Sequence, residues 1–114
     1  MISATDRIPD FLKSLEKATE KARYLVSEQV LADCNRHARR DTGELIRSSR
    51  MYSDTRAGVL VWDTPYAKRV YFEGVPNTTT NHNPEAVLMW CDYAYDRYHE
   101  DWQGIVAGVL KEVE

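Results

Sequence analysis

The chain has 114 residues, of which 43% are hydrophobic and 29% charged, and its formal net charge at pH 7 is −3. A chain of this length buries roughly two-thirds of the surface that it would expose when unfolded, which is enough for one hydrophobic core and not for two. These values exclude a large multidomain enzyme, and we expect a single domain over residues 1–114.

Residues 5–41 are predicted to form one long helix. Apolar residues recur from Ile8 to Ala38 at three- and four-residue steps, which places them on one face of an α-helix. A helix over most of this range would be roughly 45 Å long at 1.5 Å per residue. Because such a helix is too long for a 13 kDa domain to cover, part of the apolar face should either pack on the rest of the chain at a slant or meet another subunit, and self-association is the favoured alternative.

Residues 45–62 are predicted to form a β-hairpin. The segments 45–53 and 57–62 are rich in strand-forming residues, and Asp54-Thr55-Arg56, with Gly58 just after, has the composition of a turn. Residues 65–83 are expected to contain a short element, which the pattern leaves open between helix and strand, and then a polar loop.

Residues 84–113 are predicted to form the C-terminal helices. Asn83-Pro84-Glu85 combines an N-cap residue, a proline at the first helical position and an acidic first turn. Apolar residues continue at helical spacing from Trp90 to Trp102, and Gly104 is expected to bend or end this helix. The predicted fold class is α+β, with the long N-terminal helix packed on a small antiparallel sheet.

Charged and aromatic residues are unevenly distributed. Residues 1–40 carry a net charge of +2, residues 41–83 of 0 and residues 84–114 of −5. This balance lacks the overall basic character of a dedicated nucleic-acid binder, and the oppositely charged ends could attract each other in neighbouring copies. Nine of the 12 aromatic residues lie between Trp62 and Trp102, which fits either a dense core alone or a core with an aromatic contact surface.

The sequence predicts neither secretion nor membrane insertion. Residues 1–7 lack the basic and apolar regions of a signal peptide, and no apolar run approaches roughly 18 residues. Cys34 and Cys91 are therefore expected to be free thiols of a protein made in a reducing cytoplasm.

One acidic helical face invites a metal interpretation. Asp92, Asp96, His99 and Glu100 share this face and offer oxygen and nitrogen ligands, although a solvated acidic face is the favoured explanation. No glycine-framed nucleophile, phosphate-binding glycine loop or Cys-x-x-Cys motif is present in the sequence. We therefore expect neither an enzyme nor a bound cofactor or metal.

A basic cluster ends the first predicted helix. Arg36, Arg39 and Arg40 either complement the negative end of the helix dipole together with His37, or contact phosphate or an acidic partner. Two alternative functions thus stay open: a small nucleic-acid-binding regulator that uses these arginines, and a metal-assisted hydrolase that uses Asp92, Asp96 and His99.

Three motifs, in order over residues 41–102, carry a family resemblance. Asp41-Thr42-Gly43-Glu44-Leu45-Ile46-Arg47-Ser48-Ser49 resembles the T-G-x-L-x-x-S segment of minor capsid and tail-completion (head-tail joining) proteins of tailed bacteriophages. Pro65-Tyr66-Ala67 resembles a segment that follows the second strand there, and Asn83-Pro84-Glu85-Ala86 leading to Trp90 is similar to the closing helix. With Glu73-Gly74 and no threonine next, the chain looks nearer to the minor capsid branch.

The resemblance implies a non-enzymatic subunit of a head-tail connector, neck or tail-completion ring, commonly of six copies. Such a ring joins the capsid to the tail in the virion, has neighbouring connector, portal-side and tail proteins as partners, and lines or closes the channel through which DNA passes non-specifically. It also implies an α+β fold with a long helix on an antiparallel sheet. The residues expected at subunit contacts are Tyr66, Arg69, Tyr71, Glu73, Arg39 and Arg40, and those expected on an acidic channel face are Asp92, Asp96 and Glu100.

Overall fold

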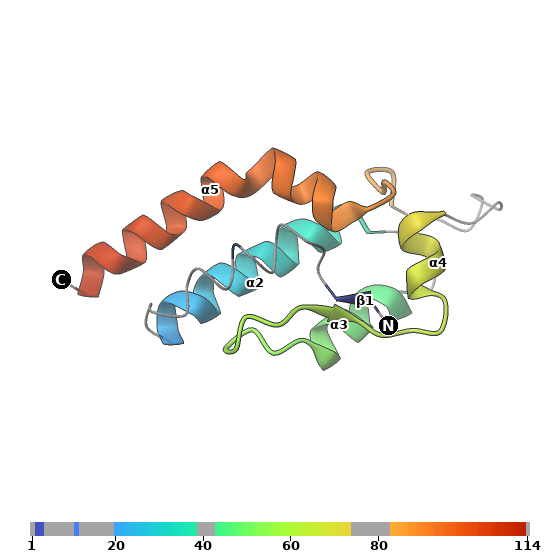
Figure 1. Cartoon of the computed structure of the whole chain (residues 1–114), viewed down its shortest axis with the longest axis horizontal. Helices are drawn as coiled ribbons and strands as arrows, with labels where there is room; N and C mark the ends of the chain where they lie inside the picture. The colour runs from blue at the N-terminus through green and yellow to red at the C-terminus, as the bar shows by residue number, and fades with distance from the viewer. Residues whose placement is uncertain (1, 4–10, 12–19, 39–42, 74–82, 114) are drawn as a thin grey trace.

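The computed structural model of the chain describes residues 2–3, 11, 20–38, 43–73 and 83–113. Its elements are β1 (Ile2–Ser3), α2 (Glu20–Arg36), α3 (Glu44–Tyr52), β2 (Val61–Trp62), α4 (Ala67–Phe72) and α5 (Trp90–Val113). Figure 1 shows α2 and α5 side by side and antiparallel, with α4 near the start of α5 and the C-terminus at the opposite end. The molecule is elongated, with extents of 51 × 23 × 21 Å.

The pairing of α2 with α5 forms most of the core. The predicted apolar stripe is confirmed over the described part of α2, where its buried members are Ala22, Val26, Val30, Leu31 and Cys34. α5 contributes Trp90, Cys91, Ala94 and Trp102, all completely buried. Over the described part of α2, the apolar stripe is therefore packed on α5 of the same chain, which is one of the two alternatives that the sequence left open.

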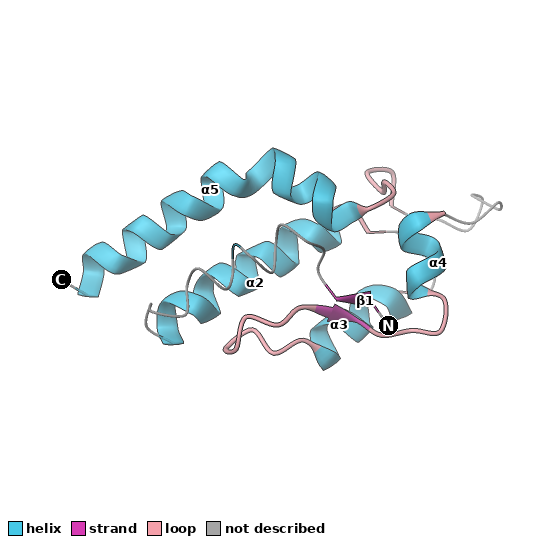
Figure 2. Cartoon of the chain, in the orientation of Figure 1, coloured by secondary structure: helices cyan, strands magenta, loops and turns pink. Residues whose placement is uncertain are grey.

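The predicted antiparallel sheet under a long helix is wrong. The structure is mostly helical, and among the residues it describes, strands are confined to the two-residue pair β1 and β2, drawn in magenta in Figure 2. β2 pairs with β1 in antiparallel register, Ile2 opposite Trp62 and Ser3 opposite Val61. The turn predicted in the middle of the hairpin is confirmed: Asp54 and Val59 exchange both backbone hydrogen bonds, at 2.8 and 2.9 Å.

The predicted first strand of the hairpin is instead helix α3, because its serines support a helix. Leu45, Ser48 and Ser49 lie three and four residues apart and are buried on one helical face. The Ser48 hydroxyl donates to the Leu45 carbonyl at 2.6 Å and accepts the Asp63 backbone N–H at 3.0 Å. The hydroxyl of Ser53, just after α3, accepts the Val61 N–H at 2.8 Å. Serine side chains thus satisfy polar groups of β2 that a neighbouring strand would otherwise bind.

The predicted end of the first helix, at residue 41, is also wrong. α2 ends at Arg36, and residues 12–19 of the predicted helix lie outside the described residues. The side-chain amide of Asn83 donates to the carbonyls of Arg36 and Ala38, at 2.9 and 2.7 Å. Asn83 therefore caps the C-terminus of α2, although the sequence suggested that it caps a following helix.

The last helix begins later than predicted, and a single helix replaces the C-terminal helices expected up to residue 113. α5 starts at Trp90 rather than after Asn83, and it continues through Gly104 to Val113. Backbone N–H groups of the preceding segment are used elsewhere: Val87 donates to the His37 carbonyl at 3.0 Å and Met89 to the Tyr71 carbonyl at 2.8 Å. These bonds hold residues 86–89 in a non-helical path between α2 and α4. The short element left open by the sequence is helical, as α4.

Gly43 allows the chain to enter α3. It precedes the helix with a φ of 87°, a left-handed conformation that suits glycine. We expect Gly43→Ala to lower the free energy of unfolding by about 1–2 kcal/mol, because a Cβ is strained at this φ. Gly104→Ala is the matched control, because no described atom lies within 4 Å of the added Cβ. This substitution within a helix should raise the free energy of unfolding by about 0.5–1 kcal/mol. Urea denaturation of both variants measures the two effects, and equal signs would contradict this explanation.

Candidate subunit interface

Four of the six predicted contact residues lie on or beside α4. Tyr66 precedes the helix and is 37% exposed, while Arg69 and Glu73 are exposed. Tyr71, in contrast, is completely buried, with its ring 4.6 Å from that of Trp90. Tyr71 is thus a core residue in this structure, where another subunit cannot reach it. The other two predicted contacts, Arg39 and Arg40, lie outside the described residues.

An apolar surface beside α4 escaped the sequence reading. Phe72 is 48% exposed, Leu88 52% and Met89 41%, and the Met89 N–H bond to the Tyr71 carbonyl holds the last two residues against α4. Both Leu88 and Met89 lie within residues 84–113, which the sequence predicts to be helical. The signal that could have found them is the unbroken apolar run Ala86-Val87-Leu88-Met89, which no single helical face can bury. The structure thus favours a core together with an apolar and aromatic contact surface.

His37 is a structural residue at the junction of α2, α5 and the segment between α4 and α5. It is 4% exposed, and its Nδ1 donates to the Glu85 carbonyl at 3.0 Å. The Nε2 atom of the same ring is hydrogen-bonded to the Tyr98 hydroxyl, at 2.9 Å. The ring also packs edge-on against Tyr93, 4.6 Å away. Sequence reasoning placed His37 only at a helix end and missed these contacts.

The predicted acidic face lies on the first half of α5. Asp92 is half-buried, whereas Asp96 and Glu100 are exposed. His99 does not join these carboxylates: its Nδ1 donates to the Tyr95 carbonyl at 2.8 Å and its ring stacks on Tyr95. Within the residues that the structure describes, no group of three or more His, Cys, Asp and Glu side chains is placed to hold a metal ion.

Arg36 is the described member of the predicted basic cluster. Its guanidinium lies 3.5 Å from the Glu85 carboxylate, in an exposed ion pair. This pair links the end of α2 to the segment after Asn83, so at least one arginine of the cluster has a local structural role.

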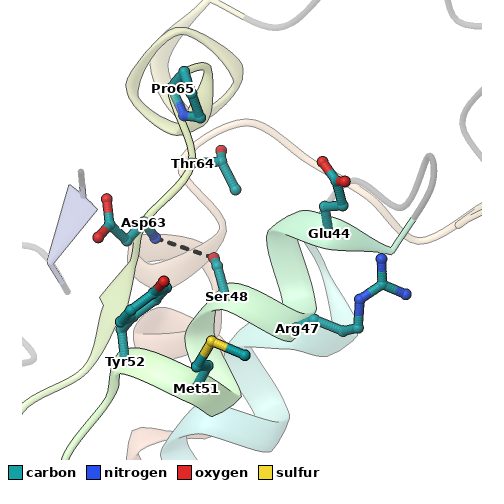
Figure 3. A pocket seen from close by; sticks show the side chains of 8 residues that line it. All are labelled: Glu44, Arg47, Ser48, Met51, Tyr52, Asp63, Thr64 and Pro65. Carbon is teal, nitrogen blue, oxygen red and sulfur yellow. Dashed lines mark hydrogen bonds between the residues drawn. The ribbon is translucent and has the colours of Figure 1, made fainter.

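A groove runs along α3 on another side of the molecule. Figure 3 shows that α3 forms one wall and residues 63–65 the other, around a volume of about 380 Å³. Met51 and Tyr52 at the end of α3 are 73% and 55% exposed. The buried hydroxyl of Thr64 has no hydrogen-bond partner among the described residues. The groove is open and mixed in polarity, and none of the predicted contact residues lines it.

Cys34 and Cys91 are both free and buried, as predicted, and they meet in the core between α2 and α5. Burial, followed by the neighbouring Cys34 thiol, raises the pKa of Cys91 well above the usual thiol range. No helix in the described part of the chain is long and apolar enough to cross a bilayer.

This pKa shift predicts an alkaline loss of stability. The unfolded Cys91 thiol loses its proton near its usual pKa of about 8.5, while the folded thiol keeps it, so the free energy of unfolding should fall as pH rises above that value. Urea denaturation at several pH values measures this slope. Cys91→Ala should make it shallower, and an unchanged slope would show that other groups cause it. Both thiols should also react slowly with iodoacetamide at pH 8 until the protein unfolds.

Comparison with known protein families supports the resemblance seen in the sequence. A family model described as "Minor capsid protein" matches residues 9–109. No curated protein and no solved structure matches the chain. The matched range contains α2, α3, β2, α4 and most of α5.

Proposed function

Because this chain belongs to the minor capsid protein family of phages, and so has a structural role in the virion, we propose that it is a subunit of the head-tail connector. In this role it assembles as a homo-oligomeric neck or tail-completion ring, contacts portal-side and tail proteins, and surrounds or closes the DNA channel. It acts without catalysis.

The observation that carries this proposal is the extent of the family match. The match covers residues 9–109, which include the helices that form the core, the exposed apolar residues beside α4 and the acidic face of α5. The function of the family is therefore the function of the folded unit as a whole. The exposed apolar residues beside α4 further support a role in assembly, since contiguous exposed apolar groups in soluble proteins mark contact surfaces.

The DNA-facing role is proposed for Asp92 and Asp96 of the predicted acidic channel face, whereas its third predicted member, Glu100, lies in the subunit contact proposed below. Asp92 and Asp96 lie on the first half of α5, and carboxylates repel DNA phosphates, so such a wall lets DNA slide without being held. Asp92→Lys and Asp96→Lys together should leave particles assembled but slow DNA release. Normal release by such particles would remove Asp92 and Asp96 from the channel wall.

The proposed function is tested by particle assembly without this protein. Phage particles made in its absence should accumulate as separate heads and tails, and adding the purified protein to the mixture should restore joined particles. Gold-labelled antibody should mark one vertex of the head. Joined particles in the absence of the protein, or label spread over the whole shell, would contradict the connector role.

A further inference from the structure

We propose that two copies of this chain meet head to tail, with the α4 surface of one copy docked on the outer face of α5 of the next. This inference rests on the proposed function and names the contact that would build the ring. The α4 surface consists of Tyr66, Lys68, Arg69, Phe72, Leu88 and Met89. The α5 outer face consists of Glu100, Asp101, Gly104, Ala107 and Gly108.

The α4 surface is apolar at its centre and is held in place. Phe72 extends from the end of α4 with its ring against that of the buried Tyr71, at 4.9 Å. Met89 lies beside it with a φ of 50°, a conformation that non-glycine residues rarely adopt. The Met89 N–H bond to Tyr71 fixes this backbone, so Leu88 and Met89 stay exposed instead of entering the core.

The charges of the α4 surface select its partner. Lys68 and Arg69 are exposed, and neither side chain forms an ion pair within the described parts of the chain. Glu73, at the end of α4, is also exposed, so two α4 surfaces facing each other would bring four cations against two carboxylates, and the remaining net positive charge opposes a symmetric contact. Glu100 and Asp101 are exposed on α5 and likewise have no ion-pair partner among the described residues. Opposite charges therefore match the α4 surface of one copy to α5 of another.

The shape of α5 beyond these carboxylates fits the same partner. Gly104, Ala107 and Gly108 leave the exposed side of the helix nearly bare, and no described atom lies within 4 Å of a Cβ built on either glycine. Contacts within the described chain thus give no reason for glycine at these positions, where alanine would favour the helix. A flat helical face next to two carboxylates can accept the bulky Phe72 and Leu88 side chains beside two cations.

The contact cannot form within one chain. Figure 1 shows α4 at one end of the molecule and the second half of α5 running to the other. A contact between different surfaces of identical subunits leaves one of each surface free at the ends of a dimer. Such a contact continues from copy to copy, and it closes into a ring when the rotation between copies divides a full turn evenly, as the proposed connector role requires.

Charge reversal on each surface tests the contact. Lys68→Glu with Arg69→Glu, or Glu100→Lys with Asp101→Lys, should each raise the dissociation constant of self-association at least about tenfold, measured by sedimentation at low salt. The quadruple variant, or an equimolar mixture of the two double variants, should restore the oligomer because each reversed surface then meets its complement. Asp63→Lys, an exposed acidic-to-basic change in the groove of Figure 3, is the matched control and should leave association unchanged.

The bare face of α5 has its own test. Gly104→Leu should leave the far-ultraviolet circular dichroism of the monomer unchanged but weaken self-association, since the added side chain projects into the proposed contact. A wild-type protein that stays monomeric at millimolar concentration would overturn the head-to-tail contact. So would oligomers that survive both reversals, or reversals that the quadruple variant does not rescue.

These outcomes are separable from the proposed function. If the double variants still form wild-type oligomers and join heads to tails, the head-to-tail contact is wrong and the connector role stands. If particles without the protein join normally, the connector role is wrong whatever the result of sedimentation.

Discussion

Trp90→Ala is expected to lower the free energy of unfolding by roughly 3–5 kcal/mol, enough to unfold much of the protein at 37 °C. Trp90 is completely buried at the start of α5, with the Tyr71 ring 4.6 Å away and the Trp62 ring 6.0 Å away, both in edge-on geometry. Truncation to alanine removes the shared partner of both rings and leaves a cavity that the surrounding helices cannot fill. Urea denaturation followed by tryptophan fluorescence and by circular dichroism measures the loss.

A matched pair of smaller substitutions separates packing from hydrogen bonding in the same cluster. The Trp62 indole N–H donates to the Asn35 side-chain oxygen at 2.8 Å, whereas the Trp90 N–H has no partner among the described residues. Trp62→Phe and Trp90→Phe remove the same volume, but only Trp62→Phe leaves the Asn35 side-chain oxygen without its hydrogen-bond donor. Trp62→Phe should therefore be more destabilising by about 1–3 kcal/mol, and equal losses would mean that the Asn35 bond contributes nothing.

His37→Ala is expected to lower the free energy of unfolding by about 2–4 kcal/mol, because it leaves two polar groups without a hydrogen-bond partner and opens a gap between three segments. The imidazole is hydrogen-bonded to the Tyr98 hydroxyl and donates to the Glu85 carbonyl, from a site that is 4% exposed. Without the imidazole, the segment that contains Leu88 and Met89 loses one of its hydrogen bonds to the end of α2. Hydrogen exchange should show faster exchange at Val87 and Met89, whose N–H groups bond to the His37 and Tyr71 carbonyls.

Tyr98→Phe is the control for this prediction. It removes only the hydroxyl that is hydrogen-bonded to His37, and it leaves the His37–Glu85 hydrogen bond and the stacked aromatic ring of residue 98 in place. The expected loss is about 1 kcal/mol with little change in exchange at Met89. If the two substitutions had the same effect, the role of His37 would be limited to its bond with Tyr98.

Periodicity predicted the helical face of α2 correctly because that signal is local and strong. The spacing of Val26, Val30 and Cys34 is enough to define one buried stripe, whatever covers it. The sequence could not say that α5 covers it, since that contact joins segments that are far apart in the chain. The polar residues Asp33 and Asn35 on α2 gave no sign that they would accept the indole N–H groups of Trp102 and Trp62.

Short-range signals failed where polar side chains bind distant backbone. Residues 45–53 have the composition of a strand, but the hydroxyl of Ser48 within α3 and that of Ser53 just after it accept backbone N–H groups of Asp63 and Val61, in and beside β2. Asn83-Pro84 has the signature of a helix start, yet the Asn83 amide reaches the carbonyls that end α2. In both cases the competing partner lies more than a turn away in sequence, and tertiary contacts override local preference.

The candidate site was predicted only in part, for the same reason. Arg69, Tyr66 and Glu73 are at the surface as expected, because charged and amphipathic residues of a short helix tend to stay accessible. Tyr71 could not be separated from its neighbours without knowing that α4 turns it towards Trp90. The apolar run that contains Leu88 and Met89 is visible in the sequence, but the backbone bond from Met89 to Tyr71, which holds the run beside α4, joins segments distant in the chain and could not be predicted.

The antiparallel pairing of α2 with α5 also has a consequence for how the chain acquires its structure. Everything between Arg36 and Trp90, including α3, β2 and α4, lies inside the loop that this pairing closes. Closing a long loop is entropically unfavourable until many contacts form together, so the pair is expected to complete folding and not to begin it. During synthesis, the apolar side of α2 therefore stays uncovered until α5 has left the ribosome, and in that interval the nascent chain is most exposed to aggregation.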